Sequence, residues 1–470
     1  MASRQQSTAR RPVEFTRGSL MASPDGHHLM HTDGSPFFYL GDTAWEIFHR
    51  LSREGVDRYL ADRNAKGFTV VQGVLLSEMN GLTTPNHYGH LPLRDLDPER
   101  PNEAFFDHVD YVVSAAEQAG IYVAILPTWG SYTREEDHRF FETHKVFDPK
   151  NARAYGRFLG ERYREAPNVI WILGGDRIPD GEGLAIWRQM AKGIAEGTNA
   201  EEDYGGLAMT FHPRGGRSSG EYFHRDRWLT FNMVQSTHYR DSSPEDMIAA
   251  DYGRVPAKPV INGEPGYERI PNGLRHPEVK LDDFDVRRFA YRSVFAGACG
   301  HTYGANEMWM MWTPELEPID PQGLVTPFLG ADTSWYGALD YPGATQMGHL
   351  RALMESRPML GRVPDQPLLA LGPGEGGCHL QATRAADGAY AMVYACRRRQ
   401  TFTVSMDHLS GDAVIAWWFD PRTGQVSRLE GALPFTGTAS FTVPDEGPDW
   451  VLVLDDPARG FPPPGRQPER

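Results

Sequence analysis

Between Phe37 and Trp312 the chain repeats one pattern, and this repeat limits its possible folds more than any other feature. A short apolar run rich in Val, Ile, Leu, Phe or Tyr ends in polar residues, and a stretch with helical periodicity follows. The candidate strands are Phe37–Leu40, Thr69–Leu76, Tyr122–Pro127, Val169–Leu173, Leu207–Phe211, Phe231–Gln235, Pro259–Asn262 and a Gly-interrupted run near Gly300–Gly304. Because no GxGxxG motif follows an early strand, the repeat predicts an α/β fold of the (β/α)₈ TIM barrel type rather than a doubly wound sheet.

Capping residues mark where several of the helices between these runs begin. Ser52, Asn102, Asp148 and Asp283 each precede a stretch with helical periodicity and are expected to be N-caps. A further helix around Gln346–Arg357 is expected to close the barrel.

From about Val363 the pattern changes to short alternating runs that are separated by turn residues. The clearest runs are Ala389–Tyr394, Phe402–Met406, Val414–Phe419, Ala439–Val443 and Trp450–Leu454. This spacing predicts a smaller antiparallel β-sandwich after the barrel. We therefore predict four segments: a disordered N-terminal segment over 1–20, the barrel over 21–360, the β-sandwich over 361–457 and a disordered tail over 458–470.

The charge balance disfavours several classes of partner. Lys+Arg 47 against Asp+Glu 62 leaves a net charge of −15, which repels nucleic acid and anionic membrane surfaces. Three cysteines without CxxC spacing indicate neither a disulfide framework nor a zinc ribbon. The first 15 residues carry charge but no apolar run, and no later segment is long and apolar enough to span a membrane, so we expect a cytoplasmic protein.

Two carboxylates lie where a (β/α)₈ barrel places its reactive groups, at the carboxyl ends of strands. Asp176 follows the fourth run behind Gly174 and Gly175, and Glu264 follows the seventh run. Strands 4 and 7 face each other across such a barrel, so the two groups can flank a sugar ring. Desolvation would raise the pKa of Asp176 and suit a proton donor, whereas a hydrogen-bonded, ionised Glu264 would suit a nucleophile. The alternative is that either is an N-cap or a buried ion-pair partner.

Other polar and aromatic side chains follow the same strands. The predicted substrate-binding residues are Asp42, Trp45, Glu78, Trp129, His212, His238, Asn262 and Trp309. Asn262 lies two residues before Glu264 and is expected on the same side of the strand. Asp42 could instead cap a helical turn at Thr43–Phe48, the tryptophans could be core residues, and Glu78 and Glu307 are rival carboxylates.

His212 and His238 also allow a metal-dependent hydrolase, because barrels of that class hold divalent ions with histidines on strands 5 and 6. The rest of such a ligand set is missing, since Gly41-Asp42-Thr43-Ala44-Trp45 stands where a His-x-His motif would be needed. We therefore expect no metal and no cofactor. A non-catalytic carbohydrate-binding barrel is the third possibility, which retention of both Asp176 and Glu264 disfavours.

The chain resembles the apiosidase-like glycoside hydrolases (family 140) from about Phe37 to Leu454. The resemblance rests on four motifs: Tyr39-Leu40-Gly41-Asp42-Thr43-Ala44-Trp45, Trp171-Ile172-Leu173-Gly174-Gly175-Asp176, Asn262-Gly263-Glu264-Pro265 and Trp418-Phe419-Asp420-Pro421-Arg422-Thr423-Gly424. It implies a retaining enzyme with Asp176 as acid/base and Glu264 as nucleophile. It also implies release of D-apiose, and we expect exo-action on a small-molecule glycoside or oligosaccharide from plants. Endo-action on rhamnogalacturonan II side chains or cleavage of another pentoside are the alternatives.

Overall fold

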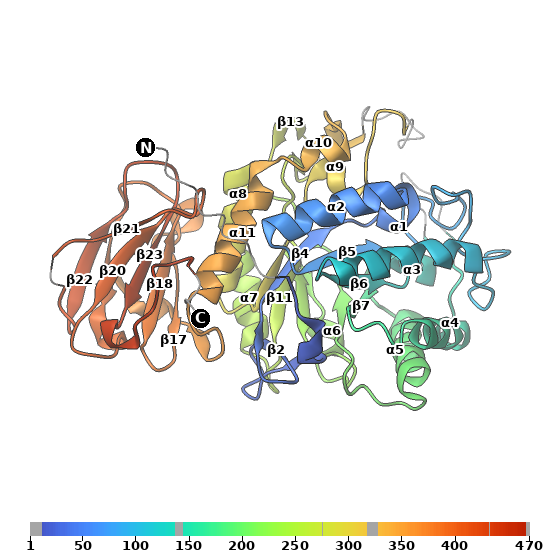
Figure 1. Cartoon of the computed structure of the whole chain (residues 1–470), viewed down its shortest axis with the longest axis horizontal. Coiled ribbons are helices and arrows are strands. Elements are labelled where there is room, and N and C mark those ends of the chain that lie inside the picture. Colours follow the sequence, from blue (N-terminus) through green and yellow to red (C-terminus); the bar gives the residue numbers. More distant parts are fainter. Residues whose placement is uncertain (1–11, 137–143, 275, 317–327, 432, 467–470) are drawn as a thin grey trace.

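The computed structural model describes residues 12–136, 144–274, 276–316, 328–431 and 433–466. Figure 1 shows two parts side by side: a barrel of strands and helices, and a smaller β domain formed by the C-terminal part of the chain. Helices α8 and α11 lie between the barrel strands and the β domain.

The barrel wall is a nine-stranded sheet in the order β8-β7-β6-β5-β4-β14-β11-β10-β9. Its parallel strands are β4 (Tyr39–Thr43), β5 (Val70–Val74), β6 (Tyr122–Leu126), β7 (Val169–Gly174), β8 (Met209–His212), β10 (Asn232–Gln235), β11 (Val260–Glu264) and β14 (Gly300–Tyr303). Short β9 (Arg217–Ser218) pairs antiparallel with β10. Hydrogen bonds from Thr230 N to Met209 O (2.8 Å) and from Thr210 Oγ1 to Phe231 O (2.7 Å) close the barrel. The predicted TIM barrel is confirmed.

Eleven α-helices connect and cover these strands within the described residues. They are α1 (Ile47–Arg50), α2 (Arg53–Lys66), α3 (Glu103–Gln118), α4 (Pro149–Arg162), α5 (Glu182–Asn199), α6 (Gly220–Phe223), α7 (Pro244–Tyr252), α8 (Asp283–Phe295), α9 (Asn306–Trp309), α10 (Trp335–Ala338) and α11 (Pro342–Glu355). None of the helices in the described part of the chain has the length and apolar character needed to cross a membrane.

Two of the four expected caps form side-chain hydrogen bonds as predicted. Ser52 accepts from Gly55 N, and Asp148 forms a capping box with Asn151. Asn102 occupies the N-cap position of α3 without a side-chain cap. The prediction for α8 was wrong by one residue: Asp282 is the N-cap, and Asp283 begins the helix. Two adjacent aspartates are equally good caps in sequence, and the helical backbone starts at the second of them, so that Asp282 accepts from Asp285 N.

The N-terminal segment differs from its prediction. Strands β1 (Leu20–Ala22), β2 (Leu29–His31) and β3 (Pro36–Phe37) form a small antiparallel sheet. The described part of the segment that was expected to be disordered, 12–20, lies against the barrel, where Val13 N donates to Gly120 O and Leu20 is buried. Residues 458–466 are also placed, and Phe461 packs against Arg357 and Tyr390. The remaining parts of both predictions, 1–11 and 467–470, lie outside the described residues.

The C-terminal domain is built from antiparallel strands, as predicted. A six-stranded sheet runs in the order β15 (Arg362–Pro364), β17 (Gln381–Ala385), β18 (Tyr390–Ala395), β23 (Trp450–Asp455), β20 (Ile415–Phe419) and β21 (Val426–Arg428). A three-stranded sheet contains β16 (Leu369–Leu371), β19 (Thr401–Ser405) and β22 (Thr438–Thr442). Side chains such as Phe402, Trp418 and Leu452 form a separate hydrophobic core here. A further hairpin, β12 (Pro271–Asn272) with β13 (His276–Lys280), lies in the barrel part.

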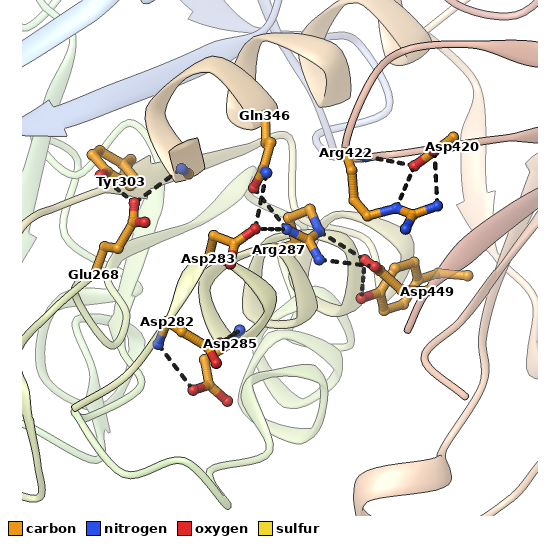
Figure 2. Close-up of polar contacts among 12 residues, drawn as sticks. Glu268, Asp282, Asp283, Asp285, Arg287, Tyr303, Gln346, Asp420, Arg422 and Asp449 are labelled. Atoms are coloured by element: carbon orange, nitrogen blue, oxygen red, sulfur yellow. Dashed lines mark hydrogen bonds and ion pairs between the residues drawn. The ribbon is translucent and has the colours of Figure 1, made fainter. Parts of the chain in front are cut away.

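Buried ion pairs join the two domains. Arg287 on α8 binds both carboxylate oxygens of Asp449 at 2.9 Å, and Tyr394 donates to Asp449 Oδ2 at 3.0 Å. On the barrel side, Arg287 also contacts Asp283 and Gln346 (Figure 2). These contacts attach the β domain to the outer side of the barrel through α8.

Candidate active site

The turn after β7 delivers Asp176 to the mouth of the barrel. Gly174, Gly175 and Asp176 all have positive φ (94°, 132° and 54°). A Cβ on Gly174 would lie 2.5 Å from His212 O, and one on Gly175 would lie 2.8 Å from Gly130 N, so only glycine allows this close approach. Asp tolerates the left-handed conformation better than most residues but still at a cost. The turn therefore stores strain at the position of the predicted proton donor.

Glu264 is the last residue of β11, and a β-bulge directs its side chain. Asn262 pairs with Val234 and Glu264 with Gln235, so Gly263 is the extra residue. The bulge separates the two side chains: Asn262 is fully buried and donates to Ser236 Oγ (2.9 Å) and to Ser293 Oγ (3.1 Å) on α8. The expectation that Asn262 lies beside Glu264 was wrong, because the bulge breaks the twofold alternation on which it rested.

Two histidines converge on Glu264. His212, the last residue of β8, places Nε2 at 2.7 Å from Glu264 Oε2, and His238 Nε2 lies 3.2 Å from Glu264 Oε1. Asp176 N donates to His212 Nδ1 at 3.4 Å. Because Nδ1 accepts this bond, the proton of neutral His212 resides on Nε2 and faces Glu264. The imidazole ring of His212 thus contacts both the backbone of Asp176 and the carboxylate of Glu264.

The environment drives the two carboxyl groups toward opposite protonation states. Burial alone would raise the pKa of Glu264, but hydrogen bonds from His212 and His238 outweigh it and hold this pKa far below its usual range. Restricted access to water raises the pKa of Asp176, and the negative charge of Glu264 raises it further against the opposing effect of Arg177. Asp176 keeps 37% of its side-chain surface exposed, whereas Glu264 keeps 7%. The site therefore pairs an ionised carboxylate with an accessible carboxyl group that binds its proton more tightly than usual.

Glu78 is a third carboxyl group in the same mouth. Its pKa is raised to about 8, first by burial and then by the charges of Asp176 and Glu264, against the opposing effect of Arg177. Glu78 was predicted as a binding residue, and the structure brings it close enough to Asp176 and Glu264 to feel their charges.

The tryptophans lie close by but are mostly buried. Trp45 and Trp129 pack edge-to-face at 5.7 Å between ring centroids, and each ring also lies within 6 Å of His212, at 5.5 and 5.8 Å. Their exposed fractions are 3% and 2%, and that of Trp309 is 6%. Trp129 Nε1 finds no acceptor among the described residues. Trp45 and Trp129 therefore pack against His212, and none of the three rings exposes an open face.

Asp42 does not reach the mouth. It lies within β4, so it is not the cap of a following turn, and it is fully buried toward α2. Tyr59 donates to Asp42 Oδ2 at 2.5 Å, and Arg63 Nη1 binds the same oxygen at 3.2 Å. Alternate residues of a barrel strand face the helices, and Asp42 is one of them. The rival Glu307 is also occupied, since it accepts from Asp332 N and Tyr341 Oη.

Three residues of the mouth were missed in the sequence. Arg177 Nε binds Glu136 Oε1 at 2.7 Å, and its Nη1 lies 3.4 Å from Asp176 Oδ2. Tyr267 lies against His238 with ring centroids 4.6 Å apart, and burial and then the charge of Glu264 raise the pKa of its phenol. Arg177 directly follows Asp176 and could have been noticed, whereas Tyr267 and Glu136 lie in loops without a recognisable signal.

His212 and His238 are not part of a metal-ligand cluster in the described part of the chain. Within the described residues, no group of three or more His, Cys, Asp or Glu side chains is arranged to hold a metal ion. His212 and His238 direct their Nε2 atoms to Glu264 instead.

Family models match both domains. Residues 23–361 match the model described as "Apiosidase-like, catalytic domain". Residues 363–455 match the model described as "Putative collagen-binding domain of a collagenase". No curated protein matches the chain.

Solved structures resemble almost the entire chain. One described as "Glycoside hydrolase" is 33% identical with a TM-score of 0.83, and the match covers 95% of this chain and 98% of that one. A glycoside hydrolase of family 5 from Bacteroides vulgatus is also 33% identical, with a TM-score of 0.84 and coverage of 95% and 96%. The likeness therefore includes both domains.

Proposed function

The chain belongs to the apiosidase-like glycoside hydrolases, and from that premise we propose that it is a retaining exo-β-apiosidase that releases D-apiose from small plant glycosides. The observation that carries the proposal is the contact of the His212 ring with both residues: its Nε2 lies beside the Glu264 carboxylate, whose pKa is lowered, and its Nδ1 accepts from the backbone of Asp176, whose pKa is raised.

The proposed mechanism has two steps. Glu264 attacks the anomeric carbon, the glycosidic bond breaks, and Asp176 gives its proton to the departing oxygen. Asp176, now a base, then takes a proton from water, and the resulting hydroxide displaces Glu264 and restores both groups. His212 and His238 keep Glu264 ionised and oriented before the first step. A carboxylate so depressed in pKa is a weak base, which favours it as a leaving group in the second step.

Binding of the sugar would use the groups around this pair. Glu78 and His238 can hydrogen bond to hydroxyl groups, while Trp45 limits the space beside the ring. The net charge of −15 supports small neutral glycosides over galacturonate-rich pectin, which it would repel. Endo-action on rhamnogalacturonan II and cleavage of another pentoside are the competing assignments.

Sugar release tests the proposal directly. Wild type, Asp176→Asn and Glu264→Gln are incubated with an apiosylated flavonoid and with para-nitrophenyl pentosides. We expect free apiose from wild type and a loss of at least about a hundredfold in both variants. Glu182→Gln, a surface change on α5, is the matched control.

The initial product, followed by proton NMR before mutarotation, should keep the anomeric configuration of the substrate. An inverted product contradicts the two-step mechanism. Another pentose as product would keep the mechanism and replace the substrate, and release only from rhamnogalacturonan II fragments would favour endo-action. Binding without turnover would favour a carbohydrate-binding barrel. Inhibition by a chelator would favour a metal-dependent hydrolase.

A further inference from the structure

The turn after β5 holds Glu78 at a defined place in the barrel mouth. Tyr132 Oη donates to Ser77 O at 2.6 Å, Gly81 N donates to Ser77 O at 3.1 Å, and His49 Nε2 lies 3.2 Å from Gly81 O. One bond within the turn and contacts from two other segments thus fix the residues on both sides of Glu78. A side chain on so constrained a turn is positioned rather than free to swing.

One short segment of chain ties this turn to the turn that carries Asp176. Trp129 N donates to Leu76 O at 2.9 Å, and Gly130 N donates to Gly175 O at 3.0 Å. Consecutive residues therefore bind the backbone two residues before Glu78 and the backbone one residue before Asp176. The two carboxyl groups are held on either side of this segment and share the same mouth.

The charges with the largest effect on Glu78 come from several neighbouring elements. They are Asp176 and Arg177 after β7, Glu264 at the end of β11 with its partners His212 and His238, and Glu46 before α1. Arg177 is already bound to Glu136 and Asp176. Among the described residues the Glu78 carboxyl group has no hydrogen-bond or ion-pair partner. A second negative charge beside Glu264, without a cation of its own, is electrostatically costly.

We propose that Glu78 works as a neutral carboxylic acid, which donates a hydrogen bond to an oxygen of the bound sugar and takes no part in proton transfer. The inference rests on the proposed function, since it names how that site holds its substrate. A neutral carboxyl group can donate where a carboxylate only accepts, and it leaves Glu264 as the single negative charge facing the anomeric centre. The raised pKa of about 8 agrees with this state near neutral pH.

Thermal unfolding tests the neutral state without any assay of activity. Because the pKa of Glu78 rises on folding from its ordinary value of 4.5 to about 8, folding is favoured fully below the lower value and loses this contribution as pH rises. Glu78→Gln lacks the titration, so its Tm relative to wild type should increase between about pH 5 and 8, by about 2–4 °C in total. Glu182→Gln is the control and should show no such trend. A flat difference for Glu78→Gln would overturn the neutral carboxyl group.

The pH profile of kcat/KM tests the donor role. Above about pH 8, kcat/KM of wild type should fall more steeply with pH than that of Glu78→Gln, because the Glu78 carboxyl group loses the proton that it donates, whereas the amide does not titrate. At pH 6, Glu78→Gln should stay within about threefold of wild type, and Glu78→Ala should lose about 5- to 100-fold for the missing donor.

Two results would overturn the proposal: a loss in Glu78→Gln as large as in Asp176→Asn, which would make Glu78 a proton-transfer group, or an unchanged slope. If wild type hydrolyses no glycoside, the proposed function fails, while the unfolding measurement still decides the state of Glu78.

Discussion

The barrel mouth and the domain interface both bury charged groups, but they treat them in opposite ways. At the interface, Arg287 binds Asp449 through two hydrogen bonds, and Asp283, Gln346 and Tyr394 satisfy the remaining atoms (Figure 2). In the mouth, Glu78 has no partner among the described residues, and Asp176 has only a long contact to Arg177. Complete pairing indicates a structural role, and incomplete pairing leaves bonding capacity for a substrate.

The largest effect is expected in the mouth, where two variants should lose activity and one of them, Asp176→Asn, should keep its stability. Asp176→Asn and Glu264→Gln should lower kcat/KM by about 10²- to 10⁴-fold, because each removes proton transfer or nucleophilic attack. Asp176→Asn should unfold at the same or higher urea concentration at pH 7, since the raised pKa of Asp176 shows that its charged form is disfavoured in the folded state. Marked destabilisation of Asp176→Asn would mean that Asp176 has a structural role like the charged groups at the domain interface.

The reverse is expected at the interface. Arg287→Ala should lower the free energy of unfolding by about 3–5 kcal/mol, because it leaves Asp449 buried without its cation. Urea denaturation measures this loss, and kcat/KM per folded molecule should stay within about twofold of wild type. The double variant Arg287→Met/Asp449→Leu should recover part of the stability, because it removes the unpaired charge. A loss below about 1 kcal/mol for Arg287→Ala would contradict a buried structural pair.

Asp42 tests whether a buried ion pair also indicates a structural role inside the barrel. Asp42→Asn should cost about 1–3 kcal/mol, because Arg63 loses one buried anionic partner but keeps Asp62. Unfolding and Michaelis kinetics on the same preparation compare the two effects. KM should not change. A raised KM with normal stability would show that Asp42 binds substrate.

The smallest effect concerns the acid limb of the pH profile. Hydrogen bonds from His212 and His238 lower the pKa of Glu264, so His238→Ala should raise it and shift the acid limb of kcat/KM to higher pH by up to about one unit. A depressed carboxyl pKa also stabilises the fold above its unfolded value, and this contribution is lost as pH falls. His238→Ala should therefore lose less stability on acidification than wild type. An unshifted limb would show that His238 does not hold Glu264 ionised.

Local pattern predicted the architecture well because hydrophobic periodicity is itself local. The eight barrel strands, the antiparallel C-terminal sheets and the caps at Ser52 and Asp148 follow from neighbouring residues. Strands β15, β16, β17 and β21 were missed, since they are short or mixed in composition, like Arg362–Pro364 and Val426–Arg428. The cap at Asp282 was missed because Asp283 offers the same chemistry one residue later.

The sequence by itself determined which carboxylates stand at the ends of the fourth and seventh parallel strands, β7 and β11, since the order of the apolar runs and the polar residues that follow them can be read directly from it. Only the tertiary structure decided what each side chain meets. The bulge at Gly263 turned Asn262 away from Glu264, the pairing of Asp42 with Arg63 removed it from the mouth, and Tyr267 and Arg177 entered from loops. The protonation of Glu78 was decided in the same way. Burial and Coulomb interactions depend on distances between residues remote in sequence, and these distances exist only once the barrel has closed.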